Sequence, residues 1–228
     1  MAYKHSSTSW NEKTELTVNL DKTKVMIFNN CGKSLNNYSF NYGVNKLNNV
    51  KCYKYLGMTL NPYGNFSLPR EELKKVGLKA LYELRKGMGD NFRENIMLTI
   101  KLFDALISPI LLYESEIWVV DCNDRIDKDP AQLVQIKFFK WLLGVNKYYS
   151  NNACRAETGK FPIKIEAQYR NFKLWLTLTK HPKHKSSRVV YNDMKSRMNK
   201  ELWSQKIKRV LDQMRLGYTS GQKHMKMT

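Results

Sequence analysis

Apolar and polar positions divide the chain into a strand-like beginning and a helical remainder. In the beginning, short apolar runs are closed by asparagine and glycine, as in strands that are joined by turns. The pattern predicts strands over residues 24–28, 38–42 and 51–60, with the turn between the last two marked by Gly43 and Asn45. A small β-structure is therefore expected at the start of the chain.

From Ser67 onward the apolar residues recur with the period of an amphipathic helix. The first helix is expected to begin at Ser67, because serine caps helices, and to be stopped by Gly87 and Gly89. A second helix is predicted over residues 92–118, with a kink or break at Pro109. The apolar stripe of the first helix consists of Leu73, Val76, Ala80, Leu81 and Leu84.

The third predicted helix starts at Asp129, where proline follows a capping carboxylate, and ends at Gly144. Its apolar face is formed by Leu133, Ile136, Phe139 and Leu143. A fourth helix begins at Pro162, and two weaker helices are predicted over residues 187–198 and 201–214. The apolar stripe of the fourth helix holds Ile165, Tyr169, Phe172 and Leu176. Two tryptophans in apolar helical surroundings are expected in the core, Trp141 and Trp175.

Positive charge is concentrated at the C-terminal end of the chain. Residues 131–228 hold 21 basic and 5 acidic side chains, so they carry +16 of the total net charge of +19. Such a field implies a polyanionic partner, most commonly nucleic acid, although a solvated basic surface without a ligand is the alternative. The candidate nucleic-acid-binding residues are Lys137, Lys140, Lys147, Lys164, Arg170, Lys173, Lys206, Lys208 and Arg209.

Neither a membrane nor a disulfide framework is expected. The longest apolar stretch, residues 103–113, is too short to span a bilayer and contains Asp104. The four cysteines have no paired spacing, which argues against a zinc ribbon and fits a reducing compartment, nuclear or cytoplasmic. These cysteines are Cys31, Cys52, Cys122 and Cys154.

Residues 16–28 contain the run Asn-Leu-Asp-Lys-Thr-Lys followed by an apolar strand, and Tyr55-Leu56-Gly57 comes further along. The first segment resembles the fourth palm motif of non-LTR (LINE-type) retrotransposon reverse transcriptases, and the second resembles their primer-grip hairpin. Residues 102–106, 109–113 and 116–118 are similar to the thumb of the same enzymes. One difference is Glu114, which stands where the family has glycine.

The resemblance implies an α+β fold that is mostly α-helical. Residues 1–66 would be a remnant of the polymerase palm with its small β-hairpin, and residues 67–145 would be thumb-like helices. Residues 146–228 would form a basic helical C-terminal extension. The unpaired edges of the palm strands would favour self-association.

Polymerase chemistry is not expected from this chain. Nucleotidyl transfer needs Mg²⁺ ions held by clustered aspartates, and the Tyr-x-Asp-Asp box of the family is missing. We therefore expect no cofactor here, although the parent family uses Mg²⁺. Lys22 matches the lysine that is proposed as a general acid in the family. In this chain we expect Lys22 to be an exposed residue of a turn. The acidic residues from Asp121 to Asp129 are expected to serve solvation and helix capping.

The expected function is sequence-independent binding of RNA, an RNA–DNA hybrid or DNA. A-form hybrids present a shallow minor groove that proteins recognise by shape and backbone contacts, a task suited to basic helices. Two alternatives remain open at this point. The chain could be a co-opted nucleic-acid or protein interaction module, or a non-functional relic of a mobile element.

Overall fold

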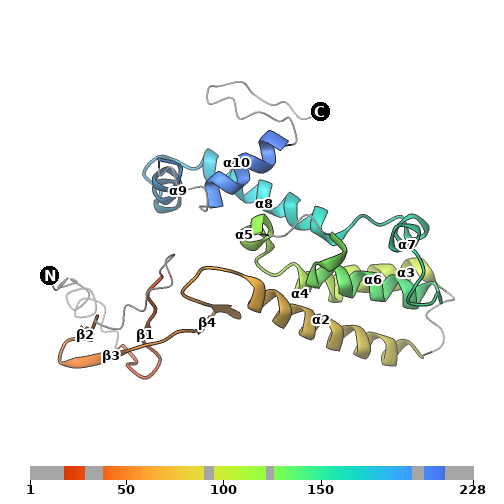
Figure 1. The fold of residues 1–228 in the computed structure, drawn as a ribbon, viewed down its shortest axis with the longest axis horizontal. Helices are drawn as coiled ribbons and strands as arrows, with labels where there is room; N and C mark the ends of the chain where they lie inside the picture. Colours follow the sequence, from red (N-terminus) through yellow and green to blue (C-terminus); the bar gives the residue numbers. More distant parts are fainter. Residues whose placement is uncertain (1–17, 29–37, 90–94, 122–125, 197–202, 214–228) are drawn as a thin grey trace. The chain divides into compact units, whose positions relative to one another are not determined.

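The computed structural model shows an α+β fold that is mostly helical (Figure 1). It describes residues 18–28, 38–89, 95–121, 126–196 and 203–213. Several expected features lie outside these residues: Leu16, Thr17, Cys31, Cys122, Asp124 and the helix ends at 92, 198, 201 and 214. The chain divides into two compact units, Met1–Pro69 and Arg70–Thr228. Among the described helices, none combines the length and the apolar character that crossing a membrane requires.

The first unit contains two small sheets. In the first sheet, β3 (Asn45–Asn49) lies between β1 (Lys24–Val25), to which it is parallel, and β2 (Phe40–Tyr42), to which it is antiparallel. The second sheet is a hairpin of β4 (Tyr53–Tyr55) and β5 (Met58–Leu60). All of these strands are short, and their residues are mostly exposed or half-buried.

The strand predictions needed two corrections. The single strand predicted over residues 51–60 is wrong, because this segment reverses direction at Leu56-Gly57. Asn45 does not belong to a turn but begins β3, where it pairs with Tyr42 across a turn that contains Gly43 at φ 60°. The tightness of both turns explains the error, since two-residue turns leave little sequence for the usual turn signals.

The second unit is built from helices. The first of them, α2, begins at Ser67, three residues before the start of this unit at Arg70. In chain order they are α2 (Ser67–Met88), α3 (Ile96–Leu106), α4 (Ser108–Leu111), α5 (Ser115–Trp118), α6 (Pro130–Leu142), α7 (Asn151–Thr158), α8 (Ile163–Lys180), α9 (Ser186–Ser196) and α10 (Trp203–Gln213). Two short 3₁₀ turns, η2 (Val119–Asp121) and η3 (Ile126–Lys128), precede α6.

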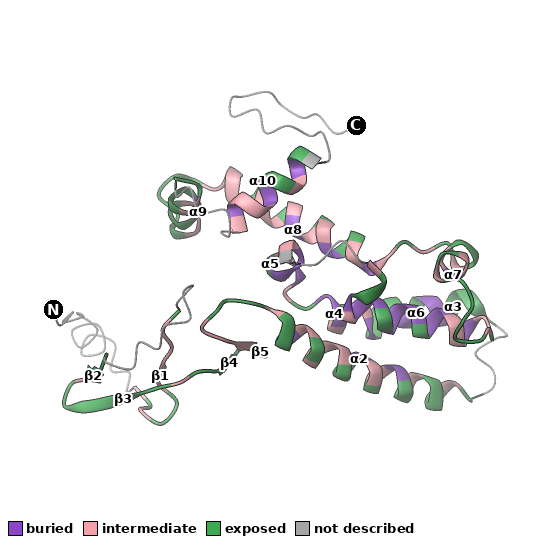
Figure 2. Cartoon of the chain, in the orientation of Figure 1, coloured by how far each residue is buried: buried purple, intermediate pink, exposed green. Residues whose placement is uncertain are grey.

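The core of this unit surrounds α6 (Figure 2). Phe138 of α6 stacks on Phe103 of α3 with 4.3 Å between ring centroids, and Phe139 packs against both rings. All three side chains are almost completely buried. Stacked and tilted aromatic pairs add favourable quadrupole contacts to the hydrophobic gain from burying large rings. This cluster anchors α3 to α6.

Most helix boundaries follow the predicted signals. The Asp129 carboxylate accepts hydrogen bonds from the backbone N–H of Ala131 and Gln132, and Gly144 at φ 67° follows the end of α6. The break expected near Pro109 separates α3 from α4, with Pro109 in the first turn of α4. A second break occurs at Glu114, whose φ of 51° is left-handed.

Helix α7 was not predicted from the sequence. Its signals were present, because Ser150 caps the helix by accepting a hydrogen bond from Ala153 N and Gly159 ends it at φ 63°. The segment is short and polar, so it has no apolar stripe from which a helix could be predicted.

The predicted buried face of α2 is wrong at Val76, which is exposed. The helix instead packs through Gly77 and Leu81, both buried. A Cβ on Gly77 would lie 2.5 Å from Cδ2 of the buried Leu111 side chain of α4, so the glycine leaves room for this side chain. A search for large apolar residues cannot find a contact that a glycine makes.

Candidate nucleic-acid interface

The palm-like motif forms a local turn. The Asn19 side chain accepts a hydrogen bond from Lys22 N at 3.1 Å, and the Thr23 hydroxyl donates to Asn19 O at 2.8 Å. Tyr53 of β4 donates its hydroxyl to Lys22 O at 3.1 Å. These bonds explain the asparagine and the threonine of the motif as turn-forming residues. The Lys22 residue itself is exposed.

The hairpin that resembles a primer grip has a strained, exposed tip. Leu56 and Gly57 have φ values of 47° and 91°, the signs that a type I′ turn requires at both central positions. Asparagine and glycine are the usual residues there, because a left-handed leucine is unfavourable. Tyr55 and Leu56 are both exposed, so the tip presents apolar side chains to solvent. Strain of this kind is often kept for function.

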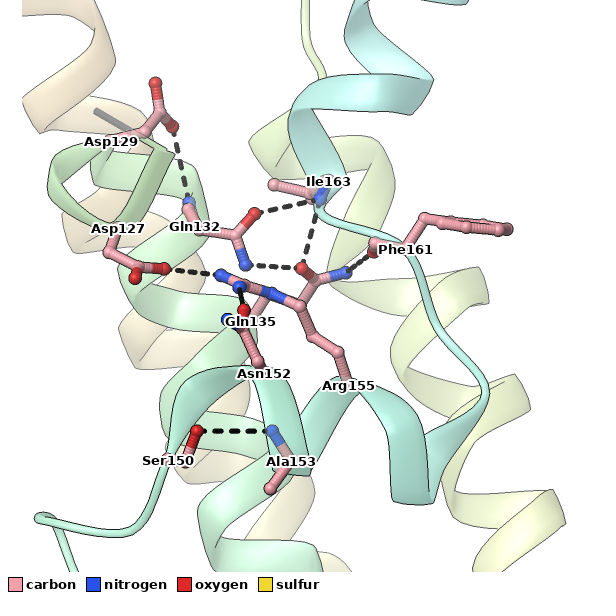
Figure 3. Close-up of polar contacts among 10 residues, drawn as sticks. All are labelled: Asp127, Asp129, Gln132, Gln135, Ser150, Asn152, Ala153, Arg155, Phe161 and Ile163. Atoms are coloured by element: carbon pink, nitrogen blue, oxygen red, sulfur yellow. Dashed lines mark hydrogen bonds and ion pairs between the residues drawn. The ribbon is translucent and has the colours of Figure 1, made fainter. Parts of the chain in front are cut away.

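The acidic segment before α6 serves structure. Asp127 forms an ion pair with Arg155 at 2.5 Å, and this hydrogen bond holds the pKa of Asp127 below its ordinary value (Figure 3). Asp129 caps α6 and pairs with Arg70. Within the described residues, no group of three or more His, Cys, Asp or Glu side chains could hold a metal ion.

Two buried amides fasten the start of α8 to α6 (Figure 3). The backbone N–H of Ile163 donates to Oε1 of both Gln132 and Gln135, each at 3.0 Å. Gln132 Nε2 donates to Gln135 Oε1 at 2.6 Å, and Gln135 Nε2 donates to Phe161 O at 3.2 Å. Buried polar groups are costly when unpaired, so this network fixes the position at which α8 begins relative to α6.

Further along, α8 is attached to the carbonyl groups around α5. Asn171, which is buried, donates to Glu116 O, and Trp203 Nε1 donates to the same oxygen at 3.2 Å. Arg170 Nη1 lies 3.5 Å from Leu112 O and its Nε pairs with Glu166 at 3.3 Å. Arg170, one of the candidate binding residues, is therefore partly engaged inside the unit.

The structure brings Lys140 and Lys147 together. Lys140 Nζ donates to Lys147 O at 2.7 Å, which closes the loop after α6. The Lys147 ammonium lies 4.9 Å from the centroid of the exposed Tyr148 ring, within cation–π range. Lys140 thus has a structural role, whereas Lys147 and Tyr148 form an exposed cation–aromatic pair.

The remaining candidates do not share one face. Lys173 follows Lys164 on α8 by nine residues, or about two and a half turns, so the two point to opposite sides. On α10, Lys206 and Arg209 lie on one side and Lys208 on the other. From α6 onward, certain exposed lysine side chains form no hydrogen bond or ion pair with another described residue: Lys137, Lys173, Lys180, Lys183 and Lys208.

The apolar stripe predicted on α8 faces solvent. Ile165, Tyr169 and Leu176 are exposed, and the buried positions of the helix are Ile163, Ala167 and Asn171. The helix is therefore attached to the core by Ile163 and by one small and one polar residue, while Phe172 of the predicted stripe is half-buried. Trp141 and Trp175 were expected in the core, but both are half-buried. Exposed aromatic residues near these lysines in the sequence were not predicted, since large apolar residues were assigned to the core.

The chain matches no protein-family model, no curated protein and no solved structure. Function is therefore inferred from the charge, exposure and contacts of the described residues.

Proposed function

We propose that the helical unit binds nucleic acid without sequence preference, as RNA, an RNA–DNA hybrid or DNA. The observation that carries this proposal is a set of exposed lysines that form no hydrogen bond or ion pair with another described residue: Lys137, Lys173, Lys180, Lys183 and Lys208. Unpaired cations on several helices attract a polyanion and release its counterions on binding. Exposed aromatics such as Tyr148 and Tyr169 lie among them in the sequence and offer stacking surfaces for bases.

We further propose descent from the palm and thumb of a LINE-type reverse transcriptase. Glu114 supports this proposal, because it adopts a left-handed φ of 51° at the position where that family has glycine. The tight Leu56-Gly57 hairpin and the Asn19 turn also suit the primer-grip and palm motifs. In this proposal, the hairpin tip would contact the sugar-phosphate backbone of a primer.

Without the catalytic aspartates, the proposed activity is binding and not synthesis. We expect no incorporation of labelled deoxynucleotides on a poly(rA)–oligo(dT) template with Mg²⁺ or Mn²⁺. Incorporation that tracks with the purified chain and disappears in Lys22→Ala would overturn this part of the proposal.

A charge-matched comparison tests the binding proposal. Lys137, Lys173 and Lys180 are replaced together by glutamine in one variant, and the control carries the same change at three lysines of the first unit. The control residues are Lys46, Lys51 and Lys54. If about 4–6 phosphates are neutralised, log K should fall with log salt at a slope of about −3 to −6.

The first variant should reduce the magnitude of that slope by about 2 to 3, because each lost phosphate contact removes about 0.9. The control should leave it nearly unchanged. Affinity that does not depend on salt, or an equal loss in both variants, would contradict the proposal.

The second candidate function is a protein interaction module. The exposed stripe of Ile165, Tyr169 and Leu176 favours it, since contiguous apolar surface often marks a protein contact. Replacing Ile165 and Leu176 by serine, which leaves Tyr169 in place, distinguishes the two functions. A protein contact would be lost with little effect of salt, whereas binding through the lysines would persist.

A further inference from the structure

A hollow of about 210 Å³ lies among α8, α9 and α10. Its apolar lining includes Trp175, Ile207 and Leu211, and its polar lining includes Lys195, Ser204 and Lys208. Pockets that enclose drug-sized ligands measure roughly 300–1,000 Å³. This hollow is smaller, so its size suits a chemical group at the end of a larger molecule.

The hollow is held in shape by contacts between the helices. Trp175 Nε1 of α8 donates to the Tyr191 hydroxyl of α9 at 2.9 Å. Gln205 Nε2 of α10 lies 3.4 Å from Lys195 O of α9. Because these bonds join all three helices, a ligand would find its binding groups already in place.

The polar lining is positively charged and incomplete. Lys195 and Lys208 both line the hollow, and none of the described acidic side chains does. Ser204 is 7% exposed, yet its hydroxyl oxygen is buried and has no hydrogen-bond partner among the described residues. Buried hydroxyl groups are normally paired, so this one lacks an acceptor or donor that a ligand would supply. An oxyanion satisfies both needs, since it accepts hydrogen bonds from a hydroxyl and from ammonium groups.

We propose that this hollow binds a terminal phosphate group. A phosphate monoester carries about −1.5 to −2 charges at neutral pH, which matches two lysines better than the single charge of an internal phosphodiester. Both the end of a nucleic-acid strand and free inorganic phosphate present this chemistry. The strand end is the occupant that rests on the proposed function, in which the same unit binds the remainder of the strand.

The test measures binding of the full chain to two single strands that differ only at the 5′ end, phosphate or hydroxyl, with a fluorescent label at the 3′ end. Fluorescence anisotropy should show about tenfold tighter binding of the phosphorylated strand, as expected for one charge-assisted hydrogen bond. Lys208→Gln should abolish that preference. Lys79→Gln, at an exposed lysine of α2 outside the hollow, should retain it.

Ser204→Ala provides a second variant. It removes a hydroxyl that has no partner among the described residues, so it should leave the melting temperature unchanged. Its preference for the phosphorylated strand should fall severalfold. Equal affinity of the wild-type chain for both strands would overturn the inference about the hollow, whereas salt-dependent binding of both would still support the proposed function.

Inorganic phosphate, compared with chloride at equal ionic strength, separates the two sources. Competition against the phosphorylated strand supports a shared site. If neither strand binds, the proposed function fails. The inference about the hollow is then tested by comparing the melting temperature of the chain in phosphate with that in chloride. A rise that Lys208→Gln removes supports a site for free phosphate, and no rise overturns the inference.

Discussion

The two units of this chain differ in how they use their apolar residues. Of the described residues up to Pro69, only Met58 and Pro69 are buried, while large apolar side chains such as Phe28, Phe40 and Tyr55 are exposed. Beyond Pro69, a continuous core includes Phe103 and several side chains of α6 that are almost completely buried.

The difference shows that apolar content alone does not produce a core. A two- or three-stranded sheet has two faces and needs a second layer before either face is protected from water. Helices of the second unit cover one another: α3, α7 and α8 pack against α6, and α9 packs against α8 and α10. The first unit therefore depends on contacts beyond its own sheets, and the second does not.

The largest expected effect concerns the state of the whole chain. Exposed strand edges and apolar side chains in the first unit should make the full chain self-associate, whereas a fragment of residues 67–228, which keeps α2 intact, should remain monomeric. Light scattering at several concentrations measures both. A monomeric full chain with a cooperative melting transition would contradict the view that the first unit lacks a core of its own.

Matched phenylalanine substitutions test the two regions directly. Phe138→Ala should lower the free energy of unfolding by about 3–5 kcal/mol, because it leaves a cavity beside Phe103 and Phe139. Phe40→Ala, at an exposed residue of β2, should change it by about 0.5 kcal/mol or less. Urea denaturation followed by far-UV circular dichroism gives both values. Similar losses would mean that the first unit has a core after all.

Each unit also has one left-handed residue other than glycine among those described, Leu56 at φ 47° and Glu114 at φ 51°. Glu114→Gly should stabilise the helical unit by about 1 kcal/mol, because glycine removes the clash of a left-handed Cβ. That corresponds to about 2–4 °C in melting temperature. Leu56→Gly should leave this transition unchanged, since its hairpin belongs to the other unit.

Glu114→Ala is the control, because it removes the carboxylate and keeps the Cβ. Burial raises the pKa of Glu114 above its ordinary 4.5, and the neighbouring Glu116 raises it further. Because this pKa is raised, the contribution of Glu114 to stability is present below pH 4.5 and is lost as the pH rises through the pKa of the folded state. Glu114→Ala should remove this pH dependence but should not relieve the backbone strain. Equal stability of the alanine and glycine variants would rule out backbone strain.

The smallest effect is expected at Asp127. Its ion pair with Arg155 lowers its pKa, so its contribution to stability is present above pH 3.8 and is lost as the pH falls through the folded value. Because this carboxylate is about half exposed, Asp127→Asn should cost about 0.5 kcal/mol or less at neutral pH. Thermal melts at pH 7 and below pH 3 measure the difference. The control is Glu157→Gln, at an exposed carboxylate of α7, and a loss of the same size there would exclude the ion pair as its cause.

Local signals predicted several helix boundaries correctly. Asp129, Pro130 and Gly144 marked the limits of α6, and Pro109 marked the break after α3. Such signals act through a residue and its immediate neighbours, so they can be recognised without knowledge of the fold. The candidate lysines were found in the same way, because a charge count needs only the sequence.

Only the tertiary structure decided which faces are buried and which lysines are available. Gly77 packs against α4 in place of Val76, and α8 turns Asn171 inward and Tyr169 outward. Lys140 hydrogen-bonds a carbonyl of the loop that follows its own helix. A periodic pattern identifies a helix and its possible apolar faces, but the buried face depends on partners that are distant in sequence. The sequence by itself therefore determined the helices and the positive charge, while long-range packing determined the surface on which that charge is displayed.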